Sequence, residues 1–365
     1  MHIVLVIDSF KGCITSVEAN AAAREGVLRA LPKAKVTSVP VSDGGEGWLE
    51  AFHAAKGGGF VETSVFDPLM RPVRASYLKL GEQAVIEMAR ASGLTLLHPE
   101  ERNPLLASSY GTGLLVADAV RQGCRNILVG LGGSATSDAG LGILRALWDA
   151  FGLALEPLAS VRFTIATDVD NPLYGPEGAA RVFGPQKGAT SAMIEELDRR
   201  AQAFAAESAR RMGYDCSCEP GAGAAGGLGY AFMQHLHAQR RSGIELLLDA
   251  FGADELFAHA DLVITGEGKA DRQTLRGKAP AGILSRAQQH DVPVIFIAGQ
   301  VEDREQLLDA GFARVECIHP SAIPLNEALR PDVTCKNGSK FFRLRTKRSP
   351  LAVVIVCLAG LLKMN

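Results

Sequence analysis

Aromatic residues are scarce in this 365-residue chain, at 6% of the total, and the formal net charge is only −2. A protein that binds single-stranded nucleic acid by stacking needs aromatic side chains. One that binds a polyanionic polymer needs an excess of positive charge. The composition supplies neither, so we expect no nucleic acid partner. With 47% hydrophobic and 21% charged residues, the chain has the composition of a globular protein and is long enough for two domains.

The seven cysteines lack the spacing of a zinc site or a disulfide framework. Only Cys216 and Cys218 lie close together, and no cluster of histidines or cysteines completes a metal site around them. The apolar stretch that begins at Ile3 reaches Asp8 too early for a signal peptide. An odd number of cysteines without a signal peptide favours reduced thiols and predicts a cytoplasmic protein.

Common nucleotide-binding and catalytic motifs are missing where they would be expected. No Gly-x-Gly-x-x-Gly follows the first predicted strand, which disfavours an NAD-dependent dehydrogenase. No glycine-rich loop ends in Gly-Lys-Ser or Gly-Lys-Thr, as a P-loop does. A covalent hydrolase is also disfavoured, because the chain has no Gly-x-Ser-x-Gly elbow.

Short apolar runs alternate with helical segments along most of the chain, which predicts a parallel α/β architecture. The strand-like runs are residues 3–7, 36–41, 126–131, 164–167, 261–265, 293–298 and 314–318. We expect Ser16 to cap a helix that runs to about Leu31. Three further runs, residues 61–66, 73–80 and 84–88, lie too close together for helices between them. That region is predicted to be antiparallel, with a hairpin turn at Gly81-Glu82.

These patterns predict a Rossmann-like parallel-sheet domain, made of residues 1–60 and 245–330, with an inserted mixed α/β domain over residues 61–244. Residues 331–365 form an atypical tail, in which positive charges at 336–348 precede an apolar run at 351–362. That run is shorter than the roughly 20 residues that span a bilayer. A core element behind a solvated basic loop, a membrane-surface anchor and a non-native terminus stay open for the tail.

Five glycine-rich loops carry the chemical signal, and most of them follow a predicted strand. Ligands of open α/β sheets bind outside the carboxyl ends of the strands, so such loops can converge. The first loop, residues 8–12, offers Lys11 to a phosphate or a carboxylate. In the second loop, residues 42–47, Asp43 supplies oxygens suited to Mg²⁺ or to hydroxyl groups. Each of these two loops could also be a simple turn.

The third loop, residues 130–140, precedes a predicted helix and consists mostly of small residues. Such a loop presents free N–H groups and the positive end of the helix dipole, so we expect it to bind phosphate. The fourth loop, residues 221–229, is either a second phosphate-binding loop or a place where helices pack closely. The residues of the two loops that we expect at the ligand are Gly132, Gly133, Ser134, Gly223, Gly226 and Gly227.

The fifth loop, residues 265–271, contains Glu267 and Asp271, and Lys278 follows shortly after it. Phosphoryl transfer needs this mixture of carboxylates and lysines, because it depends on positioning and on cation-assisted neutralisation of charge. Asp168, just past a predicted strand, and Lys187, in a Gly/Pro turn, are weaker candidates.

We expect the acids to hold Mg²⁺ or to orient an acceptor hydroxyl, and the lysines to balance phosphate charge. The catalytic candidates are Lys11, Asp43, Asp168, Glu267, Asp271 and Lys278. The candidate metal ligands are Glu267, Asp271 and Asp43, and Lys187 joins the glycine-rich loops as a candidate for binding the nucleotide.

In this order, the loops resemble those of type I glycerate kinases. The matching stretches are residues 8–12, 43–47, 132–140, 168–173, 184–188, 221–227, 242–245, 265–271 and 277–278, and the resemblance extends to about Arg330. The resemblance implies two domains, a flavodoxin-like or Rossmann-like domain and an inserted second domain. It also implies ATP and Mg²⁺ as co-substrates, glycerate as the phosphoryl acceptor and 2-phosphoglycerate as the typical product.

Two segments depart from the family pattern. Between Phe151 and Arg162 the family carries a longer glycine-containing segment, and after about Arg330 the tail no longer resembles the family's final helix. Two alternatives stay open: a kinase for another small sugar acid, because the loops do not reveal the shape of the pocket, and a non-catalytic sensor of a sugar acid or nucleotide, which the short segment favours. A sensor would bind glycerate without releasing ADP. A homodimer is an open expectation.

Overall fold

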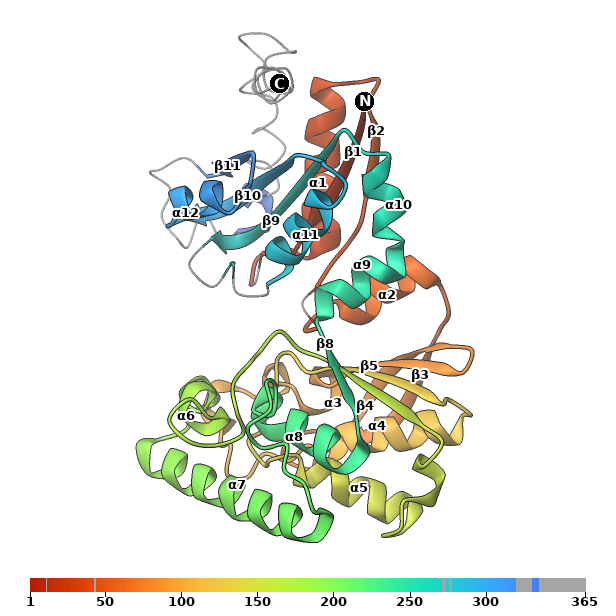
Figure 1. Ribbon diagram of the computed structural model, residues 1–365, viewed down its shortest axis with the longest axis vertical. Coiled ribbons are helices and arrows are strands. Elements are labelled where there is room, and N and C mark those ends of the chain that lie inside the picture. The colour runs from red at the N-terminus through yellow and green to blue at the C-terminus, as the bar shows by residue number, and fades with distance from the viewer. Residues whose placement is uncertain (11, 43, 271–273, 276–277, 320–329, 335–365) are drawn as a thin grey trace. The chain divides into compact units, whose positions relative to one another are not determined.

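The computed structural model describes all residues except 11, 43, 271–273, 276–277, 320–329 and 335–365 (Figure 1). The predicted tail elements therefore lie outside the described residues. The chain forms two compact units, Met1–Ser42 with Ile244–Asn365, and Asp43–Gly243. The division after Ser42 precedes the boundary expected near residue 60, and the sequence-based domain limits stay a prediction.

The first unit is built on a five-stranded sheet in the order β11-β10-β9-β1-β2, and all its strand pairs are parallel. Since β9, β10 and β11 are the third, fourth and fifth strands of this sheet along the chain, the order is the flavodoxin-like 2-1-3-4-5. The predicted fold class is confirmed. The strands are β1 (His2–Ile7), β2 (Lys35–Ser38), β9 (Leu262–Ala270), β10 (Val294–Val301) and β11 (Arg314–Cys317).

Helix α1 shows how the sequence sets an element boundary. The N-cap is Thr15 and not Ser16, because Thr15 and Glu18 form a reciprocal capping box. The Ser16 hydroxyl instead donates to the carbonyl of Ile7 at the end of β1. The helices of this unit are α1 (Ser16–Ala30), α9 (Gly243–Phe251), α10 (Ala253–Ala258), α11 (Ala279–Gln288) and α12 (Arg304–Asp309).

The second unit is built on a six-stranded mixed sheet in the order β3-β4-β5-β6-β7-β8. Pairs β3–β4 and β4–β5 are antiparallel, which confirms the prediction for residues 61–88, and β5 to β8 are parallel. The strands are β3 (Gly59–Phe66), β4 (Pro72–Leu80), β5 (Gln83–Glu87), β6 (Asn126–Gly130), β7 (Arg162–Ala166) and β8 (Gln239–Arg241).

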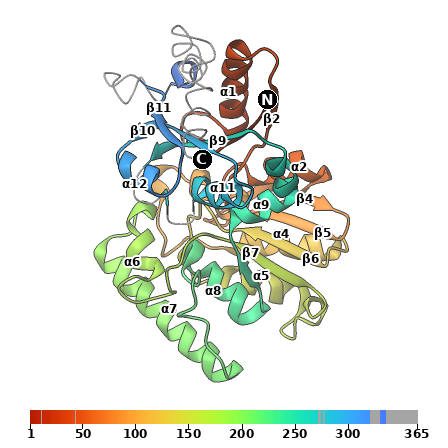
Figure 2. The same ribbon diagram turned by 45° about the horizontal axis from the view of Figure 1, so that its top comes forward.

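The main core of the second unit lies between one face of this sheet and helices α4, α5 and α8, while α2 packs on β4 and β5 (Figure 1). The long helix α7 lies along α6 (Figure 2). The helices are α2 (Trp48–Lys56), α3 (Ala89–Ser92), α4 (Tyr110–Arg121), α5 (Leu141–Phe151), α6 (Ala179–Phe183), α7 (Ser191–Met212) and α8 (Ala224–Leu236), with short 3-10 turns η1 (Leu94–Leu96), η2 (Pro99–Glu101), η3 (Glu156–Leu158) and η4 (Pro185–Lys187).

Among the residues that the structure describes, no helix combines the length and the apolar character needed to cross a membrane. Cys216 and Cys218, the close pair in the sequence, are both free thiols.

Candidate active site

In the second unit, the second and third glycine-rich loops contact each other at the carboxyl ends of the parallel strands. The Gly132 amide donates to the Gly44 carbonyl at 3.1 Å. A Cβ atom on Gly132 would lie 2.5 Å from the Cα of Gly45, and one on Gly130 would lie 2.5 Å from the Gly44 oxygen. These glycines are therefore required by the close approach of two backbones.

The fourth loop packs against the third. The Ala139 amide donates to the Gly226 carbonyl at 3.0 Å. A Cβ atom on Gly226 would clash with the Thr136 carbonyl, and one on Gly227 would lie 2.5 Å from the Cα of Ala139. Gly226 and Gly227 also have φ angles of +68° and +97°, which favour glycine. The structure thus gives these glycines a packing role, whatever ligand they also contact.

Gly223 and Asp168 lie at the same edge of the sheet. The Gly223 amide donates to the Asn171 carbonyl at 2.9 Å, which ties the fourth loop to the segment after β7. Asp168 follows Thr167, whose amide donates to the Arg241 carbonyl at 3.1 Å. These four predicted stretches of the second unit therefore converge, although Asp43 itself lies outside the described residues.

The N-terminus of α5 is already capped by side chains. The Asp138 carboxylate accepts hydrogen bonds from the Ser109 amide and hydroxyl, both at 2.8 Å, and from the amides of Gly140 and Gly142, both at 3.1 Å. The Ile143 amide donates to the Ser109 hydroxyl at 3.0 Å. The amides of Gly140, Gly142 and Ile143 are therefore already satisfied by side chains, and the predicted free N–H groups have to come from the loop ahead of the helix.

The loop before this helix end is different. Within the described part of the chain, the amides of Gly133, Ser134, Thr136 and Ser137 donate to no acceptor. The Ser137 hydroxyl is buried and also lacks a partner. Successive free amides in a loop of small residues form a concave anion site.

Lys187 supplies a positive charge to this loop. The side chain is 2% exposed, and its ammonium group donates to the Ser134 hydroxyl at 2.8 Å and to the Thr136 carbonyl at 2.6 Å. An ammonium group carries three N–H donors, and no described residue accepts the third or forms an ion pair with it. Burial lowers the pKa of Lys187 to about 7, and the Asp138 charge offsets part of this effect. A buried cation without a counter-ion is stabilised when an anion binds next to it.

In the first unit, β9 is longer than predicted. The sequence predicts that the strand ends at Thr265 and that a loop follows, but β9 continues to Ala270 because β10 runs beside it to Val301. Gly266 allows this close pairing, since a Cβ atom there would clash with the Ile297 carbonyl. Glu267 is therefore held inside a strand and not on a loop.

Glu267 and Lys278 lie close together. Glu267 is 8% exposed, its Oε1 accepts from the Thr274 hydroxyl at 2.6 Å, and its Oε2 lies 3.4 Å from the Lys278 ammonium. Lys278 is positioned as the N-cap residue of α11. Lys11 and Asp271, the other candidates of this unit, lie outside the described residues.

Asp8 belongs to the first loop, but the sequence analysis did not single it out as a candidate residue. Ile7 is paired with Gly266, so Asp8 follows β1 beside Glu267, at the point where the strand order reverses. Asp8 is 7% exposed. The side chain of Asn20 holds the backbone of Ile7, the residue before Asp8. It accepts a hydrogen bond from the Ile7 amide and donates one to the Ile7 carbonyl. The signal for Asp8 was an acid directly after an apolar strand.

Glu267 could serve as a ligand for Mg²⁺. No group of three or more acidic, histidine or cysteine side chains that could hold a metal occurs in the described ranges. Mg²⁺ usually binds through one or two carboxylates, with substrate phosphates and water completing the shell. A buried carboxylate beside a lysine, in the second half of a central strand, fits that mode of binding.

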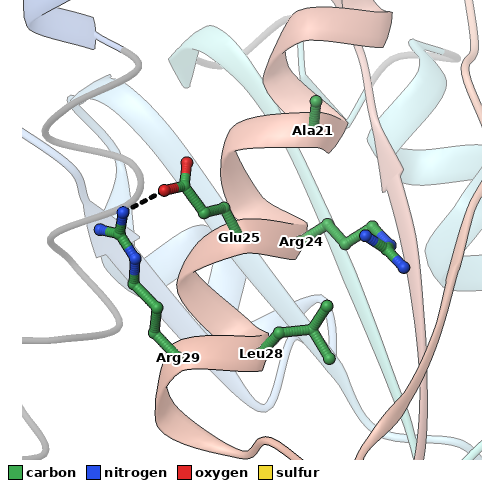
Figure 3. A pocket seen from close by; sticks show the side chains of 5 residues that line it. All are labelled: Ala21, Arg24, Glu25, Leu28 and Arg29. Atoms are coloured by element: carbon green, nitrogen blue, oxygen red, sulfur yellow. Dashed lines mark hydrogen bonds and ion pairs between the residues drawn. The ribbon is translucent and has the colours of Figure 1, made fainter.

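The surface pocket on α1 is lined by none of the candidate site residues. It encloses about 370 Å³ and is lined by Ala21, Arg24, Glu25, Leu28 and Arg29 (Figure 3). Arg29 and Glu25 form an ion pair there. None of these residues belongs to the glycine-rich loops, so we do not place the active site in this pocket.

Comparison with known proteins supports the family resemblance that the order of the glycine-rich loops indicates. The family model described as the glycerate kinase family matches residues 3–151 and 150–335. The two matched segments meet next to Phe151, where the sequence predicts a shortened segment.

Curated relatives cover nearly the whole chain. A glycerate kinase of Bacillus subtilis is 40% identical over 354 residues, which cover 90% of this chain and 93% of the relative. A glycerate 2-kinase of Escherichia coli is 40% identical over 356 residues, with the same coverage. A crystal structure of a glycerate kinase 2 from Salmonella typhimurium LT2 superposes with a TM-score of 0.78 at 37% identity, covering 97% of this chain and 98% of the other.

Proposed function

The chain belongs to the glycerate kinase family, and from this premise we propose that it transfers the γ-phosphoryl group of ATP to glycerate, releasing ADP and 2-phosphoglycerate. The observation that carries the proposal is the match to a glycerate 2-kinase at 40% identity over 90% of the chain. ATP is the phosphoryl donor. The reaction is a transfer to an alcohol group of a small organic acid.

We propose that the third loop and Lys187 bind phosphate of the nucleotide. The free amides around Gly133 and Ser134 and the buried ammonium of Lys187 support this assignment. A phosphate oxygen that accepts the third Lys187 N–H would give the buried cation its counter-ion. Gly132, Gly223, Gly226 and Gly227 shape the backbone of the same site.

We propose that Glu267 and Lys278 act at the reacting phosphoryl group, together with Lys11, Asp43, Asp168 and Asp271. Glu267 would hold Mg²⁺ with Asp271 and Asp43, and bound Mg²⁺ supplies neutralisation of phosphate charge. Lys278 and Lys11 neutralise charge on the transferring group, which in phosphoryl transfer spreads over the equatorial oxygens. The 3.4 Å separation of Glu267 and Lys278 supports a shared role. A cytoplasmic location and a homodimer stay predictions.

The function is tested by steady-state ADP release with D-glycerate, MgATP and purified protein. We expect ADP release that requires D-glycerate and is abolished by removal of the metal with a chelator. Glycerol, which lacks the carboxylate, and acceptor-free reactions are the controls. If the protein binds glycerate but releases ADP no faster than in the acceptor-free reaction, the non-catalytic sensor would be the remaining interpretation.

A further inference from the structure

Arg102 is a partly buried cation that the proposed function does not use. It is the C-cap residue of the 3-10 turn η2. Its Nε is buried and, among the residues that the structure describes, has no hydrogen-bond partner. Nor does any residue of that part of the chain accept a hydrogen bond from the rest of the guanidinium group or form an ion pair with it. Since a guanidinium group carries five N–H donors, an arginine that is partly withdrawn from water without an acceptor needs an explanation other than stability.

The segment that carries Arg102 contacts the third glycine-rich loop at both of its ends. At its start, Gly93 forms an antiparallel bridge with Ser134. At its end, the Ser109 amide donates to the Asp138 carboxylate at 2.8 Å. The turns η1 and η2 lie between these two contacts. Arg102 therefore lies on a stretch of chain that runs beside the anion-binding loop.

Arg102 also packs on the turn that holds Lys187. Gly188 is the C-cap residue of η4, directly follows Lys187 and has a φ of 86°. A Cβ atom on Gly188 would lie 2.6 Å from the Arg102 carbonyl oxygen and 3.1 Å from the Arg102 Cβ atom. The left-handed φ and this close contact both require glycine. The structure thus brings Arg102 next to the turn whose lysine serves the third loop.

The acids near these two cations have other partners. Glu101, which precedes Arg102, forms an ion pair with Arg71 at 2.7 Å. Asp138 accepts four hydrogen bonds at the N-terminus of α5. Within the described ranges, neither Lys187 nor Arg102 forms an ion pair. Neighbouring cations without a counter-ion repel each other, so an anion that binds beside them is stabilised by both.

We propose that Arg102 is a substrate-binding residue of the kinase, whose guanidinium group binds an oxyanion beside the Lys187 turn. The planar guanidinium fork pairs with two oxygens of a carboxylate or of a phosphate. The inference rests on the proposed function, because that function supplies both sources of such a group: the carboxylate of glycerate and the phosphates of ATP. The chemistry that Arg102 recognises is the same in either case, and binding measurements with each ligand tell the two sources apart.

Calorimetric titrations with D-glycerate and, separately, with the nonhydrolysable ATP analogue AMP-PNP and Mg²⁺ test the proposal, in a buffer free of phosphate, sulfate and carboxylates. The variant is Arg102→Met, which keeps most of the aliphatic length without the charge. The matched control is Arg74→Met, since Arg74 is 62% exposed and already pairs with Glu62.

We expect Arg102→Met to weaken the binding of at least one of the two ligands by about tenfold to a hundredfold. Weaker binding of D-glycerate assigns Arg102 to the acceptor carboxylate, and weaker binding of AMP-PNP assigns it to a phosphate of the nucleotide. Arg74→Met should keep both affinities within about twofold of wild type, because an exposed ion pair contributes little.

Urea unfolding of the ligand-free proteins separates a binding role from a structural one. Arg102→Met removes no hydrogen bond or ion pair between described residues, so it should unfold at the same urea concentration as wild type. Unchanged affinity for both ligands, or weaker binding together with a clearly lower unfolding midpoint, would overturn the proposal. If wild type binds the ligands but does not phosphorylate glycerate, the proposed function fails and the titrations still decide the role of Arg102. A wild-type protein that binds neither ligand would overturn both.

Discussion

Replacing Lys187 with methionine should stabilise the fold and impair the enzyme. The Lys187 ammonium is 2% exposed and has a pKa of about 7, against an ordinary value of 10.5. The unfolded chain therefore binds this proton more tightly than the folded protein does. The charge on Lys187 lowers the free energy of unfolding by its full amount below pH 7. This destabilisation decreases as the pH rises from 7 to 10.5, and it is absent at higher pH.

The magnitude follows from the pKa difference. At 1.36 kcal/mol for each pKa unit, the charge costs about 4 kcal/mol of unfolding free energy at pH 7. Methionine removes that cost but also removes the hydrogen bonds to Ser134 and Thr136. Leaving the buried Thr136 carbonyl without a partner costs about 1–3 kcal/mol. We therefore expect Lys187→Met to be more stable than wild type by about 1–3 kcal/mol at pH 7.

Urea unfolding of both proteins at pH 7 and pH 9.5 measures this difference, with Lys56→Met as a control at an exposed position of α2. The stability advantage of Lys187→Met should shrink at pH 9.5, where the folded wild type carries little charge at this site. The same variant should lose about a hundredfold in kcat/KM for ATP, the typical effect of removing one preorganised charge contact. If Lys187→Met is less stable than wild type at pH 7 and has an unchanged KM for ATP, the reasoning is refuted, because Lys187 would then stabilise the fold without binding the nucleotide.

Four other changes probe the remaining assignments. Glu267→Gln and Asp271→Asn should each lower kcat by about a hundredfold and alter the Mg²⁺ dependence; near-normal kinetics would move the catalytic role to Asp43 and Asp168. Gly133→Val should block nucleotide binding in a protein whose circular dichroism is unchanged, so an unaltered KM for ATP would remove the third loop from the site. Truncation after Arg330 should change solubility or unfolding temperature more than KM; a stable truncated protein that selectively loses glycerate affinity would contradict this.

The sequence predicted the features that depend on local pattern. The apolar run of β1, the antiparallel strands and the convergence of the loops within the second unit are all present, because alternation and chain reversal are encoded locally. Capping was predicted to within one residue: the hydroxyl at Thr15 and the acid at Glu18 form the box, whereas Ser16 was chosen from the sequence.

The sequence could not predict features that depend on contacts between distant segments. The burial of Lys187 results from the approach of η4 to the third loop, which a lysine in a Gly/Pro turn does not indicate. Ser109 takes part in capping α5 from a distant segment, since its hydroxyl donates to Asp138 and accepts from the Ile143 amide. In the sequence, Glu87 is an ordinary acid at the end of a strand. Only the packing of α2 on β5 shows that it is buried. The length of β9 depends on its partner β10, since the sequence of residues 265–270 alone suggests a loop.

The central claim is tested most directly by following the phosphorus NMR spectrum of a reaction that contains the wild-type protein, D-glycerate and excess MgATP over many turnovers. The account predicts one phosphoglycerate for each ADP, with the phosphorus signal coupled to the proton on carbon 2. Glycerate that binds the protein but is recovered unphosphorylated, with ATP intact, would contradict it.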